Sequence, residues 1–184
     1  AETDVSPVLI QTDEGGNHAI NVTVKDSVFK NVSFEPYSPI NLSHNQKKCV
    51  DGFQVLNTKF IDYDGRIILS STQIDNYNTN ITLDGCSFST REGFEGDHSL
   101  HVSYCENVVI KNNYFKNTNS GAMIGARAIN CLIKDNTFEC GTAIYLTSNA
   151  LGHGHTKITN NRFKCSTFLD GAEIGAIRDG RLFV

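Results

Sequence analysis

The stretch Val108-Val109-Ile110-Lys111-Asn112-Asn113-Tyr114-Phe115 decides how this chain folds, because it joins an apolar run, two polar turn residues and an aromatic residue. The same pattern recurs at residues 131–138 and 156–163 and, more loosely, around three earlier phenylalanines, Phe29, Phe60 and Phe88. Successive phenylalanines of this set are separated by 31, 28, 27, 23 and 25 residues. A repeat of this length indicates a stacked architecture in which each unit packs on its neighbours.

The positions before each phenylalanine form columns of like residues. The residue five positions earlier is always aliphatic, namely Val24, Val55, Leu83, Ile110, Ile133 and Ile158. The residue two positions before that one is mostly apolar, namely Val22, Phe53, Ile81, Val108, Cys131 and Thr156. This period of two predicts a strand with one buried face before each turn.

The turn itself has a characteristic composition. The residue three positions before the phenylalanine is Asp26, Asn57, Gly85, Asn112, Asp135 or Asn160. These residue types enter the left-handed region of backbone conformation at the lowest cost, so we expect a sharp bend between two short strands. The next residue is Asn in three successive copies, Asn113, Asn136 and Asn161, and stacking would place their amides in a hydrogen-bonded ladder.

A unit of about 25 residues made of short strands cannot bury its apolar face alone, so we expect parallel strands stacked ~4.8 Å apart. With its aliphatic, asparagine and phenylalanine columns, the chain resembles the right-handed parallel β-helices of the pectate-lyase-like superfamily. The resemblance covers nearly all of the chain. It implies an all-β solenoid of about six to seven coils, and we expect residues 1–184 to form one such domain, incomplete at one or both ends.

The end of the sequence contains a further partial repeat. Residues 121–126 align without a gap to residues 171–176, which predicts a seventh first strand there. Residues 181–184 would then form the middle strand of the same coil. An open stack of strand edges invites association, so we expect either a truncated coil or one that another chain or domain caps.

Composition and charge exclude several classes. The 184 residues have a formal net charge of −4, so no polybasic surface suggests nucleic-acid binding. No apolar run reaches the ~18 residues of a transmembrane helix, and residues 1–4 lack the basic and apolar regions of a signal peptide. With Gly at 15, Pro at 3 and no Trp, the chain is typical of turn-rich β-structure.

The six cysteines show no metal-ligand spacing. Cys140 and Cys165 both lie two residues after their phenylalanine, so we expect them to stack on adjacent coils, within the range of Cα distances for a disulfide. Parallel stacking keeps their Cβ atoms slightly too far apart for an unstrained bridge, which favours a pair of reduced thiols. Glycosylation sequons beginning at Asn21, Asn31, Asn41 and Asn80 would matter only in a eukaryotic secreted protein.

Enzymes of the pectate-lyase-like superfamily hold substrate along the outside of the first strand of each coil. By this resemblance, the expected substrate-binding residues are Asn41, Arg66, His98, Tyr145 and Glu173, and the expected catalytic residues are Asp97, His101 and Arg127. A carboxylate beside an imidazole can act as acid and base near neutral pH, and Arg127 could bind a substrate carboxylate. Alignment with residues 121–126 turns His101 inward, whereas alternation with Leu100 and Val102 turns it outward; the cost of burying an imidazole favours outward.

Two reaction types follow from the resemblance. Polygalacturonases carry a lone Asp, a pair of Asp and a Gly-His-Gly, of which Gly152-His153-Gly154 matches the last, but His98 replaces the second Asp of the pair. A lyase needs an Arg or Lys base, for which Arg66, Arg127 and Arg178 are candidates, and a cation such as Ca²⁺ to neutralise the uronate, although no compact carboxylate cluster marks a calcium site. No metal ligand is therefore assigned.

Three functions remain open at this point. The first is an extracellular or surface enzyme that binds and cleaves a polysaccharide as a lyase or glycoside hydrolase. The second is a non-catalytic receptor-binding or shaft module, such as a phage tailspike segment or adhesin, on a cell or virion surface, with homotrimerisation through one outer face. The third is a purely structural coil. Fold alone does not decide among them.

Overall fold

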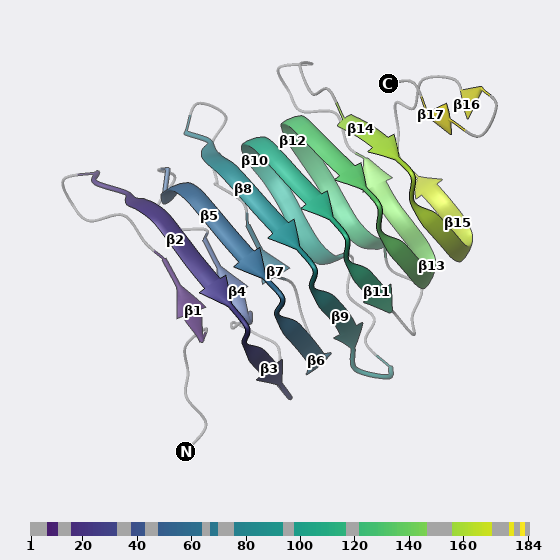
Figure 1. Cartoon of the computed structure of the whole chain (residues 1–184), viewed down its shortest axis with the longest axis horizontal. Coiled ribbons are helices and arrows are strands. Elements are labelled where there is room, and N and C mark those ends of the chain that lie inside the picture. The colour runs from purple at the N-terminus through teal and green to yellow at the C-terminus, as the bar shows by residue number, and fades with distance from the viewer. Residues whose placement is uncertain are drawn as a thin grey trace.

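Strands that recur once per turn stack in three rows around a common core in the computed structural model (Figure 1). The structure describes residues 7–10, 16–32, 38–42, 48–63, 67–69, 76–93, 98–116, 122–146, 156–170, 177–178 and 181–182. Across these ranges the chain is all-β, with no helix, and every strand pairing in the main sheet is parallel. No segment in these ranges is a helix that could cross a membrane. The chain is therefore a parallel β-solenoid.

The three rows are named here by the order in which the chain visits them. The first-strand sheet contains β1 (Val8–Leu9), β4 (Ile40–Asn41) and β7 (Ile67–Ile68). It also contains the beginnings of the long strands β10 (His98–Lys111) and β12 (Ala122–Lys134) and the ends of β13 (Thr137–Leu146) and β15 (Arg162–Asp170). The second-strand sheet contains β2 (Ala19–Lys25), β5 (Val50–Leu56), β8 (Asn78–Asp84), the later parts of β10 and β12, and β14 (Thr156–Thr159). The third-strand sheet contains β3 (Val28–Lys30), β6 (Lys59–Tyr63), β9 (Ser87–Thr90), β11 (Tyr114–Lys116) and the beginnings of β13 and β15.

The phenylalanine column is confirmed as a continuous stack. All six phenylalanines pair in register on successive turns, and neighbouring ring centroids lie 4.7–5.2 Å apart with nearly parallel planes. The inner four, Phe60, Phe88, Phe115 and Phe138, are fully buried. In the described ranges, four turns are therefore stacked between two neighbouring turns. The expected six to seven coils also counted the turns at the two ends.

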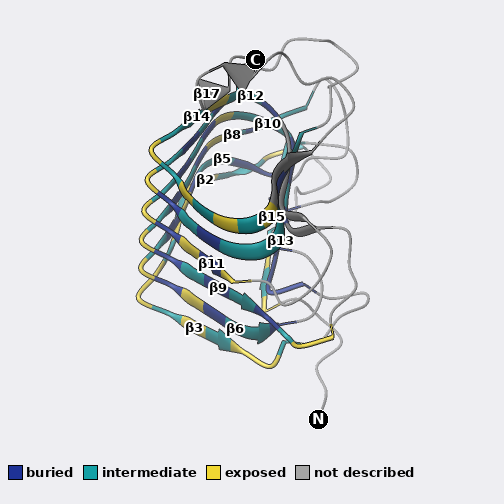
Figure 2. Cartoon of the chain, turned by 90° about the vertical axis from the view of Figure 1, so that its right-hand side faces the viewer, coloured by how far each residue is buried: buried dark blue, intermediate teal, exposed yellow. Residues whose placement is uncertain are grey.

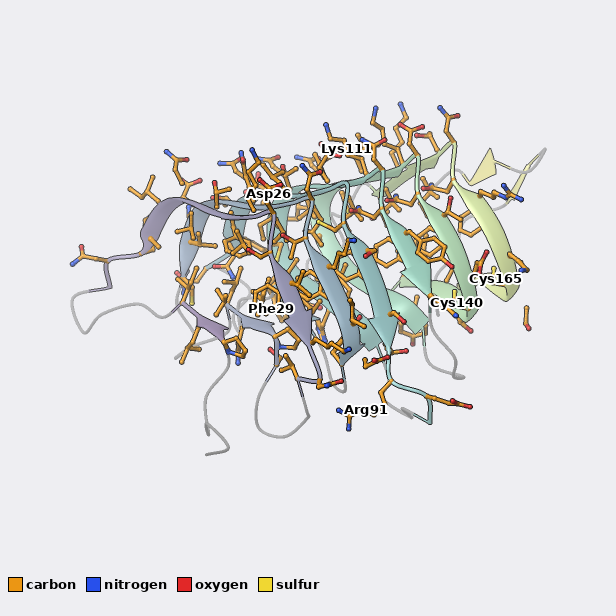
Figure 3. All side chains as sticks on the ribbon, turned by 60° about the horizontal axis from the view of Figure 1, so that its bottom comes forward. Asp26, Phe29, Arg91, Lys111, Cys140 and Cys165 are labelled. Carbon is orange, nitrogen blue, oxygen red and sulfur yellow. The ribbon has the colours of Figure 1, made fainter. Side chains whose placement is uncertain are left out.

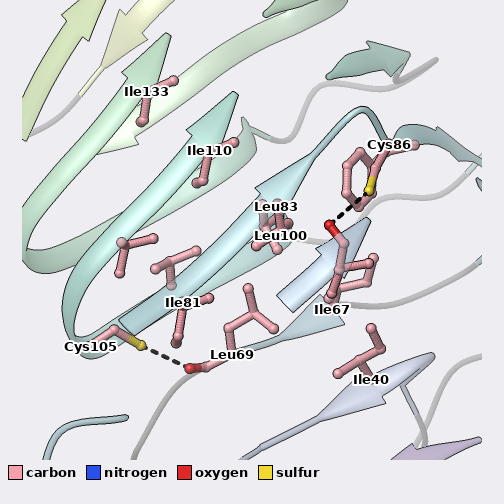
Figure 4. Packing of buried hydrophobic residues seen from close by; sticks show 14 of the residues in the cluster. Ile40, Ile67, Leu69, Ile81, Leu83, Cys86, Leu100, Cys105, Ile110 and Ile133 are labelled. Carbon is pink, nitrogen blue, oxygen red and sulfur yellow. Dashed lines mark hydrogen bonds between the residues drawn. The ribbon is translucent and has the colours of Figure 1, made fainter. Parts of the chain in front are cut away.

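The aliphatic column forms the other half of the core (Figure 4). Val24, Val55, Leu83, Ile110, Ile133 and Ile158 pair with one another in order, as predicted. The middle members are at most 1% exposed, whereas Val24 and Ile158, on the outermost turns, are half-buried. Figure 2 shows the same gradation, with buried strand interiors and exposed residues at the bends between the second and third strands. Full burial of each such side chain contributes about 1.5–3 kcal/mol.

The predicted asparagine ladder is present and buried. Asn136 Oδ1 accepts from the main-chain N–H of Asn113 at 2.9 Å and from its side-chain amide at 3.0 Å. Asn136 Nδ2 donates to the carbonyl of Ile110 at 2.9 Å and to Asn161 Oδ1 at 3.0 Å. Asn136 is 1% exposed, so its amide satisfies groups that water does not reach.

The ladder continues with shorter side chains in the earlier turns. The same position holds Ser27, Thr58 and Cys86, and each side chain donates to a nearby carbonyl. Cys86 Sγ bonds to the carbonyl of Val55 at 3.3 Å (Figure 4). The position is therefore polar or weakly polar in every turn because each bend leaves main-chain groups that need a partner.

The bend residues confirm the predicted left-handed conformation. Positive φ angles between 47° and 67° occur at Asp26, Asn57, Gly85, Asn112, Asp135 and Asn160. The sequence did not predict a second column of this kind, inside the second-strand sheet. There, positive φ angles occur at Asn21, Gly52, Asn80, Asn107 and Asn130, and Asn130 donates to Asn107, which donates to Asn80, each at 3.3 Å.

The expectation for the C-terminal end is wrong where the structure describes it. The seventh first strand falls on residues 171–176, outside the described residues. Arg181 and Leu182 do not extend the second-strand sheet as a parallel strand; they form β17 (Arg181–Leu182), which pairs antiparallel with β16 (Ile177–Arg178). The sequence between them is Asp179-Gly180, a two-residue link that favours a tight hairpin over continued winding.

Asn136→Ala is expected to destabilise the chain by about 3 kcal/mol, because it removes the hydrogen-bond partner of the buried Asn113 N–H and of the Ile110 carbonyl. Urea unfolding of this variant and of Gln54→Ala, on the exposed side of β5, measures the difference. We expect Gln54→Ala to lie within about 0.5 kcal/mol of the parent chain. Equal midpoints for the two variants would show that the ladder is dispensable.

Gly52→Ala is expected to cost more than Gly93→Ala, although both glycines have a φ near +80°. In each variant, the left-handed conformation of the alanine lowers the free energy of unfolding by about 1 kcal/mol. A Cβ at Gly52 would also lie 2.5 Å from Asn21 Oδ1, which can rotate away, and 3.3 Å from the Asn21 main-chain N, which cannot; a Cβ at Gly93 meets nothing within 4 Å. The same unfolding experiment should place Gly52→Ala about 1 kcal/mol below Gly93→Ala, and the reverse order would contradict the packing at this bend.

Candidate functional site on the outer face of the first-strand sheet

The first-strand sheet brings three of the predicted site residues into one row. Pairing in register runs from Leu9 to Asn41, Ile68, His101, Gly125, Tyr145 and Asp170. Asn41, His101 and Tyr145 therefore stand on alternate turns of the same row, although 60 and 44 residues separate them in sequence. All three side chains are partly exposed.

His101 faces outward, as alternation with its neighbours predicted. Leu100 and Val102 are fully buried, and Leu100, not His101, pairs with Ile124. The imidazole Nε2 lies 2.7 Å from Ser103 Oγ, on the same side of the strand. The first-strand part of β10 ends at Tyr104, where a φ of 50° and a register shift turn the chain into the second-strand sheet. His101 is thus held by a hydroxyl from its own strand, close to a bend.

Arg127 is brought next to this pair by the backbone register. Ser103 pairs with Arg127 on the neighbouring turn, so two of the three predicted catalytic residues lie on adjacent strands. His98 pairs with Ala122 at the beginning of the same two strands. The side chains of Arg127 and His98 lie outside the described part, as do Asp97, Arg66 and Glu173 entirely, so the roles predicted for these five residues stay predictions.

The alternative motifs do not extend this row in the part of the chain that the structure describes. Gly152-His153-Gly154 falls outside the described residues, and Arg178 lies in β16, which pairs with β17 and not with the parallel sheet. Among the residues with described side chains, no three imidazole, thiol or carboxylate groups come together as a metal-binding cluster. The calcium site that a lyase would use therefore remains a prediction without assigned ligands.

A polar network around Asp51, in the second-strand sheet, was not predicted from the sequence. Thr79 Oγ1 and Asn80 Nδ2 donate to Asp51 Oδ1 at 2.8 and 2.7 Å, and Lys48 Nζ lies 3.3 Å from Asp51 Oδ2. The bonds from Thr79 and Asn80, followed by the Lys48 charge, hold the pKa of the Asp51 carboxyl below its usual value. Both oxygens of this carboxylate have partners within the fold, and the network joins β5 to β8.

The cysteines have structural surroundings. Cys140 and Cys165 pair in register on adjacent turns, as predicted (Figure 3). All six thiols are free. Cys105 Sγ donates to the carbonyl of Leu69 at 2.8 Å (Figure 4). Burial raises the pKa of the Cys131 thiol to about 12, and burial together with the neighbouring Cys165 raises that of Cys140 to about 12. Such thiols are poor nucleophiles at neutral pH.

Comparison with known proteins finds no family model, no curated protein and no solved structure that matches this chain. The geometry therefore defines a class, the parallel β-solenoids.

Cys140 is expected to react with iodoacetamide at pH 8 at least ~100-fold more slowly in the folded chain than in guanidinium, because its raised pKa leaves little thiolate. Burial alone raises the pKa of the Cys165 thiol, whereas burial and the neighbouring Cys165 both raise that of Cys140, so Cys165 should react faster than Cys140. Cys131, which is 1% exposed, should react more slowly than Cys165. Mass spectrometry of timed digests resolves the sites. Equal rates for folded and unfolded Cys140 would refute the described burial.

Proposed function

We propose that this protein binds a linear polysaccharide along the outer face of its first-strand sheet. The observation that carries the proposal is the row formed by Asn41, His101 and Tyr145 on alternate turns. Turns stack ~4.8 Å apart, so these three groups recur about every 10 Å along the solenoid axis. A chain of sugars laid along this axis would meet a polar planar group at regular intervals.

The chemistry of the row suits carbohydrate. An amide, an imidazole and a phenol can each both donate and accept hydrogen bonds, as sugar hydroxyls require. Tyr145 adds an aromatic face with a polar tip, which packs against apolar ring surfaces while remaining wet at one edge. Gly125, which lacks a side chain, pairs with both His101 and Tyr145, so the row has room between its two aromatic groups.

Cleavage is the second candidate, and one observation favours it. His101 lies within hydrogen-bond distance of Ser103, and Ser103 pairs with Arg127, so an acid–base group and a cation occupy neighbouring strands. This arrangement agrees with the resemblance to pectate-lyase-like enzymes. In a lyase reaction, a base removes the proton beside a uronate carboxylate while a positive charge stabilises the resulting anion. A polysaccharide substrate also suggests a location outside the cell or on a virion surface.

The test is incubation with a panel of neutral and acidic polysaccharides, with and without Ca²⁺, following unsaturated uronates, reducing ends and binding in parallel. We expect binding, and we expect His101→Ala or Tyr145→Ala to weaken it about three- to tenfold, which is the net worth of one or two hydrogen bonds. His18→Ala, a partly exposed histidine outside the row, is the matched control and should bind like the parent chain.

Each readout has a distinct meaning. Unsaturated product that disappears in His101→Ala would establish a lyase, and reducing ends alone would establish a hydrolase. Binding without either product would make the row a recognition surface, as in a tailspike or adhesin. If His101→Ala and His18→Ala bind every polysaccharide equally well, the first-strand sheet is not the site.

A further inference from the structure

Positive charge gathers on the outer face of the third-strand sheet. Five exposed cations stand there, namely Lys30, Lys59, Lys116, Arg162 and Lys164. The third strands contain only two carboxylates among their described residues, Asp62 and Glu139. These strands therefore carry a net charge of +3 in a chain whose net charge is −4, so the remainder of the chain carries −7. The segregation of charge is strong for so small a surface.

The register arranges these cations in two rows along the solenoid axis. One row runs Val28, Lys59, Ser87, Tyr114, Thr137 and Arg162, and the adjacent row runs Lys30, Ile61, Ser89, Lys116, Glu139 and Lys164. The six turns span about 24 Å, so a cation occurs on average every ~6 Å of axis. Because both rows belong to one in-register parallel sheet, the charges follow a nearly straight track.

Most of these cations have no carboxylate partner among the described residues. Within the described residues, no carboxylate pairs with Lys30, Lys59, Lys116 or Arg162, whereas Lys164 lies 3.9 Å from Glu139. Glu139 also accepts a hydrogen bond from the Tyr114 hydroxyl at 2.9 Å, which raises the pKa of that tyrosine. Tyr114 itself is 39% exposed, in the middle of the two rows. The surface therefore offers free positive charge beside one aromatic face.

We propose that the outer face of the third-strand sheet binds a linear acidic polysaccharide that carries about one anionic group per sugar. The proposal does not depend on the first-strand site, since the two sheets are different faces of the coil (Figure 2). Lysines interact as point charges and suit spaced single anions. Tyr114 can pack against a sugar ring between two charged residues.

Nucleic acid matches this face less well. Single-stranded nucleic acid is usually held by several stacked aromatic side chains. Among the described residues of the third strands, Tyr114 is the one exposed aromatic residue. A row of cations with a single aromatic contact suits a charged sugar chain better than a series of stacked bases.

The test compares two triple variants with the same change in net charge. Lys59→Gln/Lys116→Gln/Lys164→Gln removes charge from the track, and Lys25→Gln/Lys134→Gln/Lys157→Gln removes it from the second-strand sheet. The probes are polygalacturonate, its fully methyl-esterified form and a thymidine oligonucleotide, titrated by calorimetry at several NaCl concentrations. We expect the parent chain to bind polygalacturonate with an affinity that falls as salt rises, and to bind the neutral ester at least tenfold more weakly.

The track variant should lose at least tenfold in affinity for polygalacturonate, and the second-strand variant should stay within about twofold of the parent chain. Thermal unfolding checks that both variants fold; if either does not, Lys116→Glu and Lys157→Glu replace them as a matched pair. Equal losses in the two variants would overturn the proposal, because net charge alone would then explain binding. Loss of binding only in His101→Ala, or tighter binding of the oligonucleotide at the same salt, would also overturn it.

Discussion

The sharp bend between the second and third strands of every turn is the constraint on which the rest of the structure depends. At this point the chain must reverse direction beside the core, where exposed main-chain groups cannot be left without partners. A left-handed residue makes the bend, and the side chain of the next residue donates to a nearby main-chain carbonyl. That carbonyl is on the same turn for Ser27 and Thr58, and on a neighbouring turn for Cys86 and the three asparagines. Asn136 shows the solution in full, since its one amide satisfies groups on three segments, at Ile110, Asn113 and Asn161.

Because the bend falls at the same place in each turn, it also fixes the register of the strands on both sides. A shift by one residue would move every aliphatic and phenylalanine side chain to the solvent face. The stack of six rings at 4.7–5.2 Å is therefore a consequence of the bend as much as a source of stability. The same register carries over to the outer faces, where residues distant in sequence become rows of side chains with a spacing of one turn.

The features predicted from sequence were those that repeat at a fixed offset from the phenylalanine. The ladder through Asn136, the left-handed bends and the pairing of Cys140 with Cys165 follow from counting alone. The second left-handed column, through Gly52 and Asn80, was missed because glycine and asparagine occur there inside an apolar strand, where sequence reasoning expects extended residues. Asn41, His101 and Tyr145 were expected on the outside of the first strands, but their alignment on alternate turns was not, since the coils differ in length and only the pairing register reveals which residues align.

The two outer faces differ in the property that recognition would use. The first-strand sheet presents hydrogen-bonding groups in the row of Asn41, His101 and Tyr145, whereas the third-strand sheet presents exposed cations around Tyr114. Neutral hydrogen bonds depend on the orientation of each hydroxyl and so discriminate among sugars, while spaced charges attract any acidic chain and weaken as salt rises. Since a rigid solenoid cannot bring these faces together, one polymer segment cannot occupy both. A protein that uses both faces would bind two polymer segments at once. The third-strand sheet would attract an acidic segment through charge, and the first-strand sheet would select a segment through hydrogen bonds.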